Sequence, residues 1–275
     1  MPKKEITILF IGDIIGRYGR AITKKMIPAI KAKERIDFVI TNGENSAAGY
    51  GITEKVYNEL TGAGIDIITM GNHVWDKKEI VTKIDEYVDL LRPANYPKEV
   101  PGKEYLIKEK NKVKIGIINL CGRVFMPALD CPFKKAEKLI EEIKKSTNII
   151  LVDIHAEATS EKEAMGFFLD GKVSAVIGTH THIQTADERV MPGGTAFIAD
   201  AGMVGSEDSV IGMNKEQILK RFLTQMPHKF EVAKEGPAIF NAVLIKVDIA
   251  TGKATSIQRI FERAPEEEIK EPAEN

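Results

Sequence analysis

Short apolar runs rich in β-branched residues alternate along the chain with longer stretches in which apolar positions recur at helical spacing. The runs are typical of strands buried on both faces, and the stretches are typical of helices that cover a sheet. The pattern predicts strands at 6–11, 37–41, 66–70, 113–119, 148–153 and 174–178. It predicts helices at 18–34, 53–62, 77–87, 133–145 and 160–169, with N-caps at Thr53, Asp76 and Ser160. This alternation indicates an α/β fold.

The order of elements changes after residue 190. Strand signals follow at 195–199, 239–248 and 254–262, and the last two are joined by a hairpin turn at 250–253. These strands suggest a second sheet packed on the first. The last thirteen residues hold five glutamates against one arginine and one lysine, which is typical of a solvated tail. We therefore expect one domain over 1–262 and a disordered acidic tail over 263–275.

Composition and charge narrow the class of protein. The chain has 275 residues and is 43% hydrophobic, which is enough to bury the core of one large domain. Its 39 lysines and arginines nearly cancel its 40 acidic residues, so no global field attracts a nucleic-acid polymer. The first apolar run ends at Gly12–Asp13 and is too short for a signal peptide or a membrane span. We expect a cytoplasmic protein that uses neither a nucleic-acid polymer nor a membrane as its partner.

Side chains that bind metals follow the predicted strands. Asp13 follows the first strand, Glu44 and Asn45 follow the second, and Asn72 with His73 follows the third. Side chains at the carboxyl ends of such strands project toward the usual ligand crevice of an α/β sheet. Asp13 alone is equally typical of a turn or a helix cap, but three consecutive strands that end in ligand-type residues favour a metal site.

Two further strands supply imidazoles. His155 ends one of them, and His180 and His182 follow the next, separated by a single residue. In a strict strand, residues two apart point to the same face, so both rings would address one point in space. We therefore expect metal ligation at these three histidines, whereas His228 lacks such neighbours and is predicted to be structural.

The ordered motifs resemble those of the calcineurin-like metallophosphoesterase superfamily and, more narrowly, the bacterial YmdB-like phosphodiesterases. The matching blocks are GDIIGRYGR, NGENSAAGYGIT, GNHVWD, RPANYP, DIHAEATSEK and GTHTHIQTADE, which lie between residues 12 and 188. The resemblance implies a metallophosphoesterase-like four-layer sandwich, in which two facing β-sheets are flanked by α-helices.

The sequence departs from the wider superfamily pattern at two places. Most members carry Asp-x-His after the first strand, but Asp13 is followed by two isoleucines, and Gly43–Glu44 stands where most have Gly-Asp. The YmdB-like resemblance implies that Asn45 replaces the missing histidine as an oxygen donor. It implies one metal held by Asp13, Glu44, Asn45 and His182, and a second held by Glu44, Asn72, His155 and His180.

A carboxylate that bridges two cations is chemically suited to phosphoester hydrolysis. It holds the cations about 3.5 to 4 Å apart, where they bind phosphate oxygens and convert a shared water to hydroxide at neutral pH. Imidazole with carboxylate and amide oxygens suits first-row transition metals. We predict iron or manganese, with zinc or cobalt as alternatives.

The resemblance also implies that His73 faces the substrate and protonates the leaving-group oxygen, a task that imidazole performs well near neutral pH. Asp76 could orient His73 or cap the helix that follows, and we favour the cap. Three arginines are candidate phosphate contacts, although each is individually more typical of a surface or structural role: Arg17, Arg20 and Arg92.

Two segments are candidates for the substrate entrance. The glycine-rich stretches 201–206 and 209–212 could line it, although glycine in tight turns is the favoured alternative. Phe125, Met126 and Phe133 could form an apolar lip for a base, or could equally be core.

The YmdB-like resemblance implies a metal-dependent phosphodiesterase that acts on 2',3'-cyclic nucleotides by attack of a metal-bridging hydroxide. Two alternatives remain from the residues alone. The same metal pair would serve a phosphomonoesterase, and the missing superfamily histidine is compatible with a regulatory metal-binding protein of little turnover. Oligomeric state is not readable from the pattern, and the resemblance is compatible with a homo-oligomer.

Overall fold

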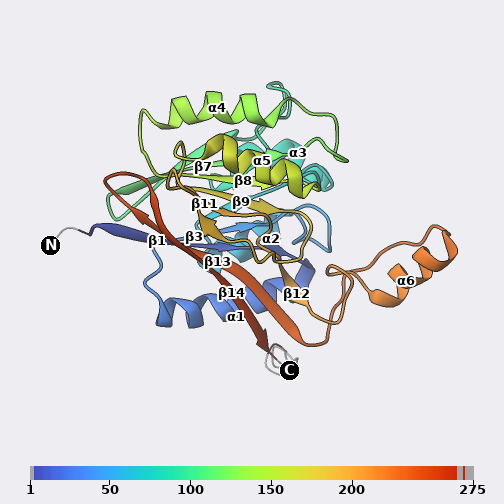
Figure 1. Ribbon diagram of the computed structural model, residues 1–275. Helices are drawn as coiled ribbons and strands as arrows, with labels where there is room; N and C mark the ends of the chain where they lie inside the picture. The colour runs from blue at the N-terminus through green and yellow to red at the C-terminus, as the bar shows by residue number, and fades with distance from the viewer. Residues whose placement is uncertain (1–2, 265–268, 270–275) are drawn as a thin grey trace.

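The computed structural model describes residues 3–264 and residue 269 and contains two β-sheets packed face to face between layers of helices (Figure 1). The first sheet has eight strands in the order β2-β12-β13-β1-β3-β4-β5, with β14 paired to β13. Its strands are β1 (Glu5–Ile11), β2 (Asp13–Ile14), β3 (Phe38–Asn42), β4 (Ile67–Thr69), β5 (Leu90–Leu91), β12 (Met203–Ser206), β13 (Ala238–Asp248) and β14 (Ala254–Ala264).

The second sheet has six strands in the order β10-β11-β9-β8-β7-β6. They are β6 (Tyr105–Lys110), β7 (Val113–Cys121), β8 (Ile150–His155), β9 (Ala175–Thr179), β10 (Arg189–Val190) and β11 (Ala196–Ile198). The helices are α1 (Gly16–Lys33), α2 (Glu54–Gly62), α3 (Lys78–Lys83), the 3-10 turn η1 (Ile84–Glu86), α4 (Pro132–Ile143), α5 (Thr159–Leu169) and α6 (Lys215–Thr224). Within the described residues, no helix combines the length and apolarity that a membrane crossing requires.

Strand β1 shows why the central strands are apolar without interruption. Its Ile8 and Phe10 lie between the two sheets, together with residues of β7, β8 and β9. Its Leu9 and Ile11 point the other way and pack with the helices that cover the first sheet, α1 among them. A second outer core joins α4 and α5 to the other sheet. Both faces of each sheet are therefore buried, and the α/β fold with two facing sheets flanked by helices is confirmed.

The division of strands between the sheets differs from the sequence prediction. The late strands do not build a sheet of their own, because β11 pairs with β9 in the second sheet while β13 inserts beside β1 in the first. The register of β1 with β13 runs from Glu5–Asp248 to Ile11–Ala242. Pairing over such sequence separations is decided by tertiary contacts rather than by local pattern.

Several short or weakly patterned elements were not predicted, namely β2, β5, β6, β10, β12 and α6. Helix α6 projects from the two-sheet body (Figure 1), and Ile218 is its buried residue. Of the predicted N-caps, Thr53 accepts a bond from the backbone N–H of Val56 and is confirmed. The prediction for Ser160 is wrong, because α5 begins one residue earlier and Ala158 is its N-cap.

The carboxyl-terminal end of the chain is only partly described. Strand β14 continues through Ala264, two residues beyond the predicted domain boundary at 262. Apart from Ile269, the rest of the expected tail over 263–275 lies outside the described residues. The single domain and the disordered tail stay predictions.

Candidate metal centre

Six of the seven predicted metal ligands converge through side-chain or backbone contacts, and the seventh is adjacent. The strands that carry them are parallel neighbours within each sheet, β3 with β4 in the first and β8 with β9 in the second, so the carboxyl ends of each pair lie together. The packing of the two sheets brings the two pairs into contact, as the bond between Glu44 and His155 shows. Asp13 lies in β2, Glu44 and Asn45 follow β3, Asn72 follows β4, His155 ends β8, and His180 and His182 follow β9. The sequence prediction that these strand ends meet is therefore correct as geometry.

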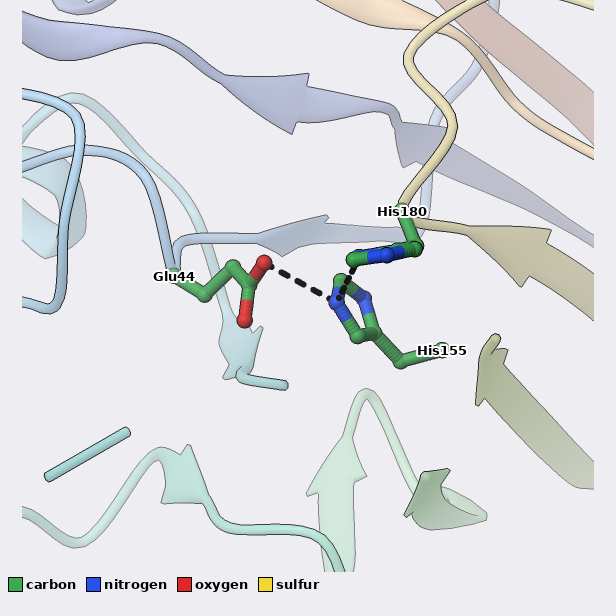
Figure 2. A group of neighbouring side chains, drawn as sticks. All are labelled: Glu44, His155 and His180. Atoms are coloured by element: carbon green, nitrogen blue, oxygen red, sulfur yellow. Dashed lines mark hydrogen bonds and ion pairs between the residues drawn. The ribbon is translucent and has the colours of Figure 1, made fainter. Parts of the chain in front are cut away.

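Glu44, His155 and His180 form the tightest cluster at this edge. Their side chains converge in Figure 2, and one ligand atom of each lies within 4.8 Å of the others. Glu44 Oε1 is 2.9 Å from His155 Nε2, and that nitrogen is 2.9 Å from His180 Nδ1. Glu44 and His155 are fully buried, whereas the His180 side chain keeps 20% of its exposure. The cluster is thus an inner site with one open side.

Asn45 joins the remaining ligands to Glu44. Its Nδ2 lies 3.1 Å from His182 Nε2, 3.3 Å from Glu44 Oε1 and 3.5 Å from Asp13 Oδ1. These acceptors surround the amide, so the nitrogen rather than the expected oxygen faces them. A half-turn of the amide about its last bond presents Oδ1 to the same point. Glu44 Oε1 contacts both groups, which is the position that a bridging ligand requires.

Asn72 lies beside the cluster without a direct bond to it. Gly71, the residue before it, passes so close that a Cβ there would be 2.2 Å from Glu44 Oε2 and 2.4 Å from His155 Nε2. On the other side, the backbone N–H of His73 donates to Glu44 Oε2 at 3.1 Å. Asn72 Oδ1 is buried and has no hydrogen-bond partner in the described part of the chain. An unpaired carbonyl oxygen beside Glu44 is unfavourable unless a donor or a cation meets it.

The histidines after β9 are arranged differently from the prediction. The strand ends at Thr179, and His180 and His182 both adopt left-handed backbone conformations, with φ of 100° and 66°. They are therefore not successive same-face residues of a strand. The bend sends His180 toward His155 and His182 toward Asn45, so the two imidazoles serve different groups.

His155 and His182 are each oriented by a partner on the ring nitrogen that faces away from the centre. Nδ1 of His182 donates to the carbonyl of Ile211 at 2.8 Å. Nδ1 of His155 lies 2.9 Å from Thr179 Oγ1, and that hydroxyl donates to Asp153 at 2.7 Å. Both rings thereby present Nε2 to the centre, as metal-binding histidines do. Sequence reasoning missed Asp153, although a lone carboxylate inside the apolar strand β8 was a usable signal.

The electrostatics of the centre are those of a buried set of acids and imidazoles. Burial raises the pKa of Asp13 to about 7, against the opposing charges of His182 and His155. Burial also acts to raise the pKa of Glu44, but His155 outweighs it and lowers that pKa to about 2. Conversely, burial acts to lower the pKa of His155, and Glu44 raises it to about 9. Burial and the charge of His155 together lower the pKa of His180 to about 3.

This donor set fits transition-metal ions. It combines buried carboxylates, amide groups and imidazole nitrogens, which are the ligands that manganese, iron, cobalt and zinc take in proteins. The unpaired oxygen of Asn72 and the facing nitrogens of His155 and His180 are each suited to a cation. The residues present therefore fit the metals that the sequence predicted.

His73 stands at the edge of the centre, with its side chain 28% exposed. Its Nδ1 is 2.8 Å from Asp76 Oδ2, and the ring of Tyr50 contacts it edge-on at 5.1 Å. The predicted cap by Asp76 is wrong, because α3 begins after Lys77 and has no side-chain cap. Asp76 instead fixes the ring of His73, since a carboxylate this close to Nδ1 is a stronger partner than a distant backbone N–H.

Two of the arginines proposed for phosphate binding are structural. Arg20 pairs with Glu59 at 2.8 Å and donates to the carbonyl of Ser46 at 2.6 Å. Arg92 is 1% exposed, and its guanidinium donates to three backbone carbonyls. Arg17 is exposed, and its role stays a prediction.

Of the segments expected to line the substrate entrance, some residues are buried in the core and others are exposed. Residues 203–206 form β12 inside the first sheet, so this part of the glycine-rich stretch is not an entrance loop. Phe133 packs against Phe168 in the outer core, whereas Phe125 is 90% exposed. Only Phe125 of these two aromatic residues is free to meet a ligand.

The chain is similar to known proteins over most of its length. The sequence model of the YmdB-like protein family matches residues 9–260. The chain is 52% identical over 254 residues to the 2',3'-cyclic-nucleotide 2'-phosphodiesterase of Bacillus subtilis (strain 168), covering 92% of this chain and 96% of that protein.

Two solved structures are also similar over almost their whole length. A novel phosphatase from Mycoplasma pneumoniae has a TM-score of 0.89 and 39% identity, with 96% of each chain covered. A hypothetical protein from Thermus thermophilus has a TM-score of 0.88 and 39% identity, covering 94% of this chain and all of that one. The family match over residues 9–260 includes every strand end that carries a candidate ligand.

Proposed function

Because the chain belongs to the YmdB-like protein family, we propose that it is a metal-dependent phosphodiesterase that hydrolyses 2',3'-cyclic nucleotides. The observation that carries the proposal is the cluster of Glu44, His155 and His180, of which the first two are buried and the third is partly exposed. The name of the Bacillus subtilis relative adds support for the substrate and for cleavage at the 2' ester. A phosphomonoesterase or a nearly silent regulatory protein is less well supported, since the relative is named as a phosphodiesterase.

The proposed centre holds two transition-metal ions that share Glu44. Asp13, Asn45 and His182 would complete one set of ligands, and Asn72, His155 and His180 would complete the other. The chemistry that such cations supply when bound is Lewis acidity toward the phosphate and toward the attacking water. Iron or manganese is still the expected metal, with zinc or cobalt as alternatives.

His73 is the proposed general acid. Hydrolysis at the 2' ester adds the hydroxyl of water to phosphorus, breaks the P–O2' bond and leaves the 2' oxygen in need of a proton. Asp76 holds Nδ1 of His73, so Nε2 is the atom that would deliver this proton and regain one from solvent.

Three exposed apolar side chains on loops bonded to the candidate ligands are proposed to form an apolar rim for the base of the substrate. Ile183 is 61% exposed and directly follows His182, and Ile211 is 44% exposed and holds His182 through its carbonyl. Phe125 lies in the loop that begins at Gly122, whose N–H donates to the carbonyl of His155 at 2.9 Å. Exposed apolar side chains on separate loops around one polar centre fit a ligand with a charged group and a flat apolar one.

Replacing Phe125 by Ala is expected to raise KM for a 2',3'-cyclic nucleotide by about 5- to 100-fold, the worth of one base–aromatic stack. Steady-state kinetics on a cyclic nucleotide and on base-free ribose 2',3'-cyclic phosphate would measure it, and only the former should weaken. Phe167→Ala is the matched control, because Phe167 is 64% exposed on α5 and is assigned no part in the rim. An equal loss on both substrates would remove Phe125 from base binding.

Metal analysis of the purified protein together with a substrate screen tests the proposed function. We expect two transition-metal ions per chain, hydrolysis of 2',3'-cyclic nucleotides well above that of monoesters, and loss of turnover when a chelator removes the metal. One metal equivalent with full activity would contradict the dinuclear centre. Faster turnover of monoesters would favour the phosphomonoesterase, and a metal-loaded protein without turnover would favour the regulatory alternative.

The remaining expectations concern the setting of the enzyme. We propose a small-molecule substrate, no nucleic-acid polymer as partner because the charges nearly cancel, and a cytoplasmic location without a membrane partner because the first apolar run is short. A homo-oligomer is compatible with the family resemblance and is checked by light scattering.

A further inference from the structure

Thr181 lies between two histidines whose backbones are strained. His180 and His182 both have positive φ, which costs conformational free energy for any residue with a Cβ. Such a conformation persists only where the surrounding structure holds it in place. The contacts of Thr181 therefore help to decide where both imidazoles point, together with the bond from the His182 ring to the Ile211 carbonyl and the bond from the His180 backbone N–H to Asp13 at 3.2 Å.

Those contacts converge on one oxygen of Asp200. Oδ2 of Asp200 accepts from the backbone N–H of Thr181 at 3.0 Å and from its hydroxyl at 2.6 Å. The same oxygen pairs with Lys162 Nζ at 2.8 Å. The other oxygen, Oδ1, accepts from the backbone N–H of Gly202 at 2.8 Å. The carboxylate thus accepts from four donors, and two of these are the backbone N–H and the hydroxyl of Thr181.

Lys162 and Asp200 are buried, at 1% and 0% exposure. A buried ion pair carries a large desolvation cost for both charges, so it adds little to stability compared with an apolar pair of the same volume. The pair instead fixes the orientation of the groups bonded to it, since charge-assisted bonds are short and geometrically defined. The pair joins α5 and the segment after β11 to the bend after β9.

We propose that Lys162 and Asp200 act as a positioning clamp, which holds Thr181 so that His180 and His182 each face their own half of the metal centre. The inference rests on the proposed function, because it assigns a role in metal binding. Neither residue touches the substrate in this assignment. The clamp acts only through Thr181.

Asp170 provides an internal comparison at the other end of the same sheet. Its carboxylate accepts from the backbone N–H groups of Gly193 at 2.8 Å and Thr195 at 3.4 Å, and so also fastens a loop. That loop carries no candidate metal ligand. Asp170→Asn is therefore a matched control that weakens a carboxylate-to-loop contact without touching the centre.

The test compares Thr181→Val, Thr181→Ser and Thr181→Ala with the wild-type chain, using manganese titration and metal analysis on protein kept below its unfolding transition. Thr181→Val and Thr181→Ala lose the hydroxyl bond to Asp200, and Thr181→Ser keeps it. We expect the first two to bind manganese about 10- to 100-fold more weakly, the usual effect of removing an outer partner of a metal ligand. Thr181→Ser should stay within about threefold of wild type on the same scale.

Asp170→Asn should lower Tm while leaving manganese affinity unchanged. If Thr181→Val and Thr181→Ala behave like Asp170→Asn, with reduced Tm and unaltered metal binding, the clamp is merely structural and the inference is wrong. If Thr181→Val does not fold, the same comparison rests on Thr181→Ala. A wild-type chain that binds no manganese, iron, zinc or cobalt would instead overturn the proposed function, so the two failures are distinct.

Discussion

His73→Ala is expected to retain both metals and to lose about 10²- to 10⁴-fold in turnover on a cyclic nucleotide, the usual worth of a positioned general acid. The contact of this residue with Glu44 is made by its backbone N–H, which alanine also possesses. The side chain is bonded to Asp76 and not to any candidate ligand. The substitution therefore removes the acid while leaving the contacts of the metal centre in place.

The loss should depend on the leaving group. A 2' alkoxide needs a proton to depart, whereas nitrophenolate departs without one, so His73→Ala should be much less impaired on a nitrophenyl diester. Asp76→Asn is the companion variant, and we expect a smaller loss with the same dependence on leaving group. Metal content by elemental analysis accompanies each assay. If His73→Ala empties a metal site, or impairs both substrates equally, His73 is a ligand or a phosphate-binding group instead.

Glu44→Gln is expected to lose more metal than any other single ligand substitution. Glu44 Oε1 contacts both His155 and Asn45, so its charge serves candidate ligand side chains in both halves of the centre. The side-chain contacts of Asp13 are with Asn45 and His182 in one half, and it meets the other half only by accepting from the backbone N–H of His180 at 3.2 Å. Removing a shared ligand should weaken binding by more than the roughly 10- to 100-fold that the loss of an outer partner costs. Turnover should fall with the metal.

Asp13→Asn is the matched control for this experiment, because it also neutralises one buried carboxylate. We expect it to keep one metal near wild-type affinity and to weaken the other. Metal analysis across a titration, with Tm measured on each variant, separates loss of ligand from loss of fold. A larger metal loss in Asp13→Asn than in Glu44→Gln would assign the bridging position to Asp13.

The residues of the centre were readable from the sequence because each follows a strand. The apolar runs before Glu44, Asn72 and His155 are local signals, and parallel strands of one sheet place their carboxyl ends at one edge. The contact of His155 with Glu44 also requires the two sheets to pack face to face. The same logic predicted the strand β9 before His180. The expectation that His180 and His182 point to one face, as in a strict strand, was wrong, because the bend after Thr179 depends on Asp200, which lies outside any local window.

Pairing within the fold shows the same limit. Strands β13 and β14 were predicted within two residues of their observed ends, but the sheet that they join was not. Asp76 was correctly placed at a strand-to-helix junction, and its partner was misjudged. A helix cap and an imidazole compete for the same carboxylate, and only the path of the turn from His73 to Lys77 decides between them.

The sequence by itself determined the α/β class, most strand and helix positions and the set of side chains that gather at the centre, since these depend on periodicity and on the chemistry of neighbours along the chain. Only the tertiary structure decided which imidazole meets which acid. Asn45 and His182 are 137 residues apart and lie 3.1 Å from each other. Contacts of that kind depend on how the two sheets pack and on which buried groups hold the loops between them, and no local pattern encodes either.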